Sequence, residues 1–88
     1  MALFAKIENN IVLDVIVISN ENCDNLPFPE SEPVGQAFIA SMGISGEWKQ
    51  TSYVAAYRGS YAGAGFIWDP NAGEYGSFVA PPNDIQEI

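Results

Sequence analysis

The chain of 88 residues contains no histidine and a single cysteine, and these scarcities exclude several functions. Without histidine, the commonest general base and the usual partner of a nucleophilic cysteine are both missing. A zinc site with Cys and His ligands is excluded for the same reason, and we expect neither a metal centre nor a cofactor. The lone Cys23 cannot form an internal disulfide, so we predict an inert thiol in a loop or core rather than a disulfide-stapled domain.

Basic side chains are also scarce. Lys6, Lys49 and Arg58 stand against eleven acidic residues, which gives a net charge of −8. Nucleic acids and anionic lipid surfaces are bound mainly through Lys and Arg, so we expect no nucleic acid and no membrane among the partners. The acidity favours solubility. The alternative is a docking surface for a basic partner or for divalent cations, although the acidic loop 20–33 lacks the ligand spacing of an EF-hand.

Long hydrophobic runs are missing too. The N-terminus "MALFAKIENN" has no basic region followed by a long apolar stretch, so we expect no signal peptide. The most apolar run, "IVLDVIVIS", is too short to cross a bilayer and contains Asp14. These features predict synthesis and folding in a cytoplasm. The chain length allows one domain with one small core.

The first half of the chain predicts a β-hairpin followed by a helix. Residues 2–8 and 11–19 are rich in β-branched side chains, and the Asn-Asn pair between them suits a two-residue turn. A regular hairpin pairs Ile7 with Val12, Ala5 with Asp14, and Leu3 with Ile16. Since residues 11–18 are apolar nearly throughout, we expect both faces of the second strand to be mostly covered.

A short helix is expected after the Pro-rich loop 20–33. Ser31 or Glu32 can cap it, Pro33 suits its first turn, and Gly43 follows its end. Helical spacing predicts the face that docks on the sheet, formed by Val34, Ala37, Phe38 and Met42.

The second half of the chain predicts three more strands. They are residues 47–57, "GFIWD" and "YGSFVA", the last two flanking the turn 70–73. The predicted fold is therefore α+β, a small and mostly antiparallel sheet with one short helix packed on it; five short strands with glycine bends also suit a partly closed barrel. We expect residues 1–82 to form this single domain and residues 83–88 to form an extended or disordered tail.

The segment "RGSYAGAGFIWDPNAG" sets large aromatic side chains beside glycines. It lacks the spacing of a dinucleotide fingerprint and the lysine of a P-loop, so we do not expect a phosphate site. Glycines here would allow close backbone approach, with aromatic rings covering them. The predicted interaction surface consists of Tyr57, Arg58, Tyr61, Phe66 and Trp68. The alternative is a small carbohydrate-binding module whose stacking platform is Tyr57, Tyr61 and Trp68.

Two pairs of carboxylates could in principle support acid–base chemistry. Glu30 and Glu32 lie in a Pro-rich loop, whereas Asp69 and Glu74 flank a turn, so both pairs are expected to be surface or capping charges. In the absence of a clustered catalytic set, we predict that the protein is not an enzyme.

Three ordered stretches resemble a family of small proteins encoded by cyanophages and other marine tailed phages. They are "MALFAKIENNIVLDVIVISN", "FPESEPVGQAFIASMGISGEWKQTSY" and "RGSYAGAGFIWDP", which together extend over roughly residues 1–70. Trp68 stands where these relatives often have Tyr, and they commonly continue further at the C-terminus. The resemblance implies a virion structural or tail-fibre-associated protein, located in the virion or in the cytoplasm of an infected marine bacterium. It implies no catalytic residues.

We also predict self-association. A small core and a long apolar strand both gain stability by burial between copies, so we expect a homo-oligomer, in the first instance a dimer, and contacts with other virion proteins. The contacts are expected from the first hairpin and from residues 57–68, and the buried area to be ~1,000 Å² or more.

Overall fold

The computed structural model describes residues 1–81, which form one five-stranded antiparallel sheet with the strand order β3-β1-β2-β4-β5. The elements are β1 (Ala2–Glu8), β2 (Ile11–Ile18), the 3-10 helix η1 (Asn20–Cys23), α1 (Ser31–Ser41), β3 (Glu47–Thr51), β4 (Ile67–Asp69) and β5 (Ser77–Val79). The predicted α+β class is confirmed, but the sheet does not close, so the barrel alternative is wrong. The predicted tail 83–88 lies outside the described residues.

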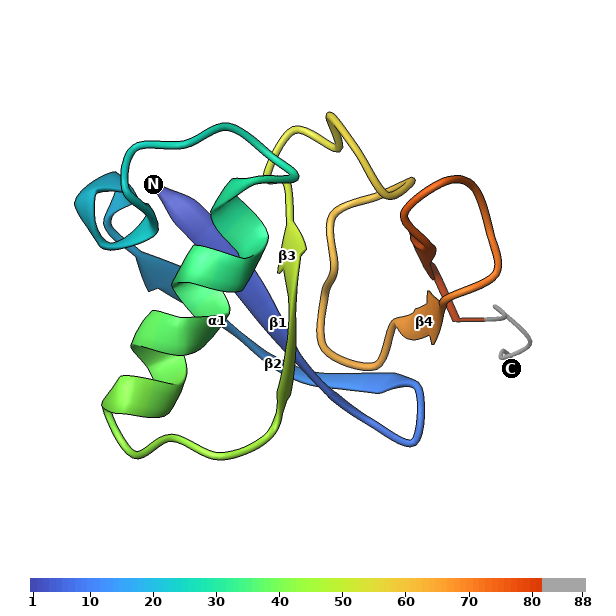
Figure 1. The fold of residues 1–88 in the computed structure, drawn as a ribbon. Helices are drawn as coiled ribbons and strands as arrows, with labels where there is room; N and C mark the ends of the chain where they lie inside the picture. The colour runs from blue at the N-terminus through green and yellow to red at the C-terminus, as the bar shows by residue number, and fades with distance from the viewer. Residues whose placement is uncertain (82–88) are drawn as a thin grey trace.

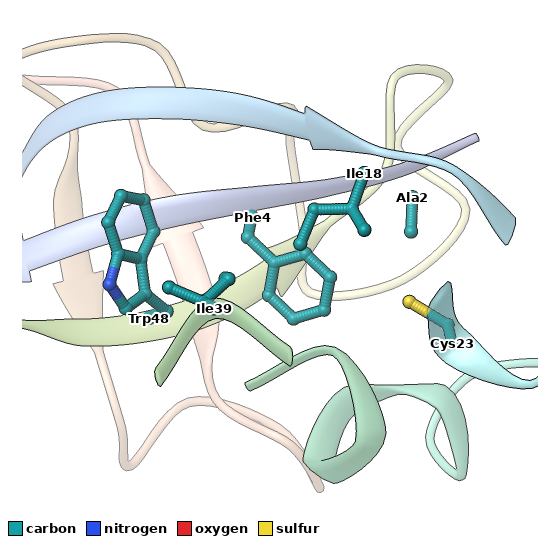
Figure 2. Packing of buried hydrophobic residues seen from close by; sticks show 6 residues of the cluster. All are labelled: Ala2, Phe4, Ile18, Cys23, Ile39 and Trp48. Carbon is teal, nitrogen blue, oxygen red and sulfur yellow. The ribbon is translucent and has the colours of Figure 1, made fainter. Parts of the chain in front are cut away.

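The sheet has a hydrophobic cluster on each of its two faces. On one face, α1 packs against β1, β2 and β3 around Phe4, Ile18, Ile39 and Trp48 (Figures 1 and 2). On the other face, residues of β1 and β2 pack against the later part of the chain, in a cluster formed by Ala5, Ile7, Val12, Ala62, Trp68 and Phe78. Strands β1 and β2 thus pack against the helix on one face and against the segment 52–81, which contains β4 and β5, on the other.

A β-bulge in the first hairpin explains how one strand serves both clusters. Ile7 pairs with Val12 as expected, but Lys6 then pairs with Asp14, so the predicted pairs of Ala5 and Leu3 are wrong by one residue. Alternation along a regular strand would put Val12 and Ile18 on the same face. The extra residue at Leu13 reverses the alternation, and both side chains are buried on opposite faces.

The helix ends where the sequence predicts but docks through a different face. It spans Ser31–Ser41, and Gly43 follows at a φ of +78°, as expected for a residue that ends a helix. The buried residues are Ser31, Gly35 and Ile39, whereas Met42 is 60% exposed. Of the predicted docking face, Phe38 packs against the cluster, but Ala37 and Met42 are exposed. The buried face is centred on Gly35 and Ile39, because Gly35 gives the ring of Phe4 the space it needs against the helix backbone.

The remaining elements are shorter than the sequence predicts. Strand β3 stops at Thr51, and residues 52–66 form turns and irregular backbone instead of the expected continuation to residue 57. The two strands around the turn 70–73 are present as β4 and β5. Within the loop 20–33, which was expected to be irregular, η1 buries Cys23 against α1.

Candidate functional site

The outer edge of β3 is closed by side chains rather than by another strand. The backbone N–H of Gln50 donates to Glu32 Oε2 at 2.7 Å, and the Gln50 carbonyl accepts from Arg58 Nη1 at 3.0 Å. One turn further along α1, the Gln36 amide donates to the Trp48 carbonyl at 2.6 Å. These side chains take the positions that an added strand would occupy, so β3 is protected from edge-to-edge pairing.

A buried ion pair joins the helix to the second half of the chain. The two terminal guanidinium nitrogens of Arg58, Nη1 and Nη2, donate to the Glu32 carboxylate, and the two side chains are only 6% and 14% exposed. The Arg58 Nε donates to the Tyr75 carbonyl at 3.0 Å. The expectation that Glu32 is a solvated surface or capping charge is wrong, because Arg58, 26 residues later, folds back onto it.

The second edge, that of β5, is also covered. The Phe78 N–H donates to the Arg58 carbonyl at 2.9 Å, and the Ser60 hydroxyl donates to the Phe78 carbonyl at 2.9 Å. Gly59 forms a bridge with Phe78, where its φ of +80° and a distance of 3.2 Å from a virtual Cβ to the Phe78 carbonyl oxygen favour glycine. At Gly59, the glycine-rich segment therefore serves close backbone approach, as the sequence indicates.

The residues of the predicted interaction surface lie partly in the core and partly on the surface of the protein. Arg58 is buried in its ion pair, and Trp68 of β4 is 5% exposed, in contact with its cross-strand partner Phe78 of β5. The Tyr57 ring stacks on Phe28 with a centroid distance of 3.9 Å, and its hydroxyl donates to the Thr51 carbonyl. These groups stabilise the fold, and an exposed surface that includes Arg58 and Trp68 is not formed.

Tyr61 and Phe66 are half-buried. Tyr61 meets the exposed Tyr53 edge to face at 5.6 Å, and Phe66 covers Gly63. Because Trp68 lies in the core while Tyr57 is stacked on Phe28, the three rings of the sugar-stacking alternative do not form a shared open platform.

The outer edge of β2 is open over most of its length. Strand β2 pairs with β4 only at Ile11, and the backbone bonds from Val12 to Gly65 and Phe66 end that contact. Within residues 1–81, no further strand or backbone bond covers residues 13–18 on the side away from β1. We call residues 13–18 the open edge. Its N–H at Val15 donates to the carboxylate of its neighbour Asp14 at 2.8 Å.

An apolar groove of about 340 Å³ lies between the open edge and α1. Seven of its nine lining residues are apolar, and none is charged; they are Ile16, Val17, Ile18, Ser19, Asn22, Phe38, Ile39, Met42 and Ile44. Val17 is 57% exposed, and Met42 and Ile44 are also exposed. The expectation that both faces of the second strand are covered is therefore wrong, and the open edge with its groove is the candidate functional site.

The apolar character of residues 11–18 is a sequence signal for this site, although it does not by itself indicate an open edge. An apolar strand with a single charge, Asp14, is expected either in a sheet centre or at an interface. Met42, assigned to the docking face, instead stands at the mouth of the groove, because the buried face of α1 is centred on Gly35 and Ile39. The apolar pattern alone does not distinguish a core face from a contact face.

Cys23 is a free, buried thiol, and its burial predicts how the stability of the fold changes at alkaline pH. Burial, followed by the nearby Asp24 carboxylate, raises the pKa of the thiol above its usual 9.0. Below about pH 9 the thiol is neutral in both states; above it the unfolded chain loses the proton first, so the free energy of unfolding falls as the pH rises. Urea unfolding between pH 7 and 10 should show this fall.

The variant Cys23→Ala is the control for that prediction. We expect its unfolding free energy to stay level to a higher pH, where the phenol of Tyr57 begins to act. Burial raises the pKa of Tyr57 above its usual 10.0 as well. An identical alkaline fall in both proteins would contradict the assignment to the thiol.

No group of three or more His, Cys, Asp or Glu side chains within residues 1–81 is arranged to hold a metal ion. In that same part of the chain, no helix is both long enough and apolar enough to cross a membrane. Comparisons with protein-family models, with curated proteins and with solved structures find no match to this chain.

Proposed function

We propose that this protein is a non-enzymatic structural or accessory protein that acts through protein–protein contacts at the open edge of β2. The observation that carries the proposal is the contrast between the sheet edges. Side chains and backbone close the edges of β3 and β5, whereas residues 13–18 are left open beside an apolar groove. Exposed strand edges are a liability that proteins normally blunt, so an edge left open is most economically explained by a partner.

The phage-type context comes from the three ordered sequence stretches. They support a role as a component of a tailed-phage virion, or as a protein that assists its assembly in the cytoplasm of an infected marine bacterium. In such an assembly the open edge would bind a neighbouring copy or another virion protein. The acidic surface, with a net charge of −8, would keep the free chain soluble before assembly.

The test is the protein content of purified particles from a cultured phage that encodes this chain. We expect mass spectrometry to find the protein in the particles or in assembly intermediates, and its gene to lie among tail genes. A protein found only free in the lysate, with a gene among metabolic neighbours, would contradict the proposal. Saturable sugar binding that is lost in Tyr61→Ala would favour the carbohydrate-binding alternative.

A further inference from the structure

We infer that the open edge binds a second copy of this chain, and that the two β2 strands pair antiparallel across a two-fold axis perpendicular to the sheet. The inference rests on the proposed function, since it names the partner at the same surface. An antiparallel pairing of identical segments is self-complementary, which is what a two-fold interface requires. The result would be a continuous sheet through both copies.

The backbone of the open edge has groups that face away from β1 at alternate positions. The Val15 N–H donates to the neighbouring Asp14 side chain, so it is not engaged in the ladder with β1 and faces the edge. Antiparallel strands alternate between residues that bond to one neighbour and residues that face the other. Val17 therefore faces the same way as Val15, and both can exchange bonds with the partner.

The register of the pair follows from side-chain alternation and charge. A two-fold axis perpendicular to the sheet keeps each face on its own side, so the axis passes through a residue rather than between two residues. An axis at Ile16 pairs Val15 with Val17 and Asp14 with Ile18. The two Asp14 side chains are then four positions apart along the strands, roughly 14 Å, which exceeds the screening length at physiological salt.

The same axis brings the two apolar grooves together. Both copies of α1 lie on the same face of the joint sheet, so Phe38, Met42 and Ile44 of one copy face those of the other across the seam. A specific interface takes ~800 Å² from each partner. The surface available for such an interface consists of the backbone of residues 13–18, the Val17 side chain, and the exposed side chains of Met42 and Ile44 on the α1 side.

Charge gives the inference a distinctive signature. Each chain carries a net charge of −8, so the two copies repel each other at long range while the contact itself is apolar. Salt screens this repulsion, and we expect dimerisation to strengthen as salt rises. A cationic peptide bound at the same edge would show the opposite dependence, because salt weakens attraction between opposite charges.

The test is light scattering and sedimentation of the whole chain at two salt concentrations. We expect a mass of twice the 9.5 kDa chain, with a dissociation constant that falls between low and physiological salt. Val17→Glu should weaken dimerisation roughly tenfold or more, because it adds a carboxylate to each side of the seam. The matched control is Val79→Glu, the same change at a 45% exposed valine on β5, and it should leave the dimer intact.

A cross-link tests the register and does not depend on how the glutamate variant folds. In the proposed register the two Ile16 residues form a non-hydrogen-bonded pair. The Cα atoms of such a pair are ~4.5 Å apart, which suits a disulfide. Ile16→Cys should therefore form a covalent dimer under mild oxidation, whereas Val79→Cys should not.

Two results would overturn the inference: a monomer at all concentrations and salts, or a dimer that Val17→Glu does not weaken. The proposed function is tested separately. If the protein is present in phage particles but stays monomeric in solution, the function stands and the partner at the open edge is another virion protein.

Discussion

Glu32→Ala is expected to reduce the free energy of unfolding by about 3–5 kcal/mol, because it leaves the Arg58 guanidinium buried without its partner. The same change removes the group that holds the Gln50 N–H at the β3 edge. A small domain has a total stability of roughly 5–15 kcal/mol, so this loss is a large share of the whole. Urea denaturation followed by tryptophan fluorescence measures it, since Trp48 and Trp68 are buried.

Two further variants show whether the loss comes from the unpaired charge. Glu30→Ala removes an exposed carboxylate two residues away and should change stability by less than about 0.5 kcal/mol. The double variant Glu32→Gln with Arg58→Met removes both charges and should recover part of the loss, because no unpaired charge remains. Equal losses in Glu30→Ala and Glu32→Ala would contradict the importance of the ion pair.

Gly35→Ala is expected to destabilise the protein by about 1–3 kcal/mol, although alanine is the better helix former by ~1 kcal/mol. A Cβ atom at position 35 would lie 2.7 Å from Phe4 Cε1 and 3.1 Å from Cys23 Sγ. Phe4 is fully buried between the sheet and the helix, so its ring has little room to move. Thermal unfolding followed by circular dichroism should show a clear fall in the midpoint.

The origin of this effect is tested by changing the neighbour. In a Phe4→Leu background, Gly35→Ala should cost less than in the native chain, because the smaller side chain leaves space for the added methyl group. Ala40→Gly, at an exposed position of α1, measures the effect of helix propensity on stability without a change in core packing. A stabilising Gly35→Ala would show that the ring and the helix are not in close contact.

Local patterns along the chain predict the elements better than they predict how those elements pack. The Asn9-Asn10 turn, the glycine after α1 and the last two strands follow from local backbone preferences, and the structure contains them. The bulge at Leu13 does not follow from local preference, because it arises where Val12 and Ile18 must be buried in clusters on opposite faces. Burial on two sides overrides the regular register of the hairpin.

The candidate site could be predicted only in part. Composition marks residues 11–18 as too apolar for a solvated strand, and the structure leaves the outer edge of residues 13–18 open. The pairing of Glu32 with Arg58 spans 26 residues and depends on the course of the loop 52–66, which no local pattern specifies. Aromatic density alone does not show which rings the core takes, so it places Tyr57 and Trp68 on a surface, whereas Tyr57 stacks on Phe28 and Trp68 is buried.

Amide hydrogen exchange by NMR tests the central claim most directly, namely that side chains close the edge of β3 while the open edge of β2 is available to a partner. At low protein concentration, we predict slow exchange at Gln50, whose N–H is held by Glu32, and fast exchange at Val17. As the concentration rises, Val17 should become protected and Gln50 should not change. Slow exchange at Val17 at every concentration, or protection that develops only within residues 57–68, would contradict the account.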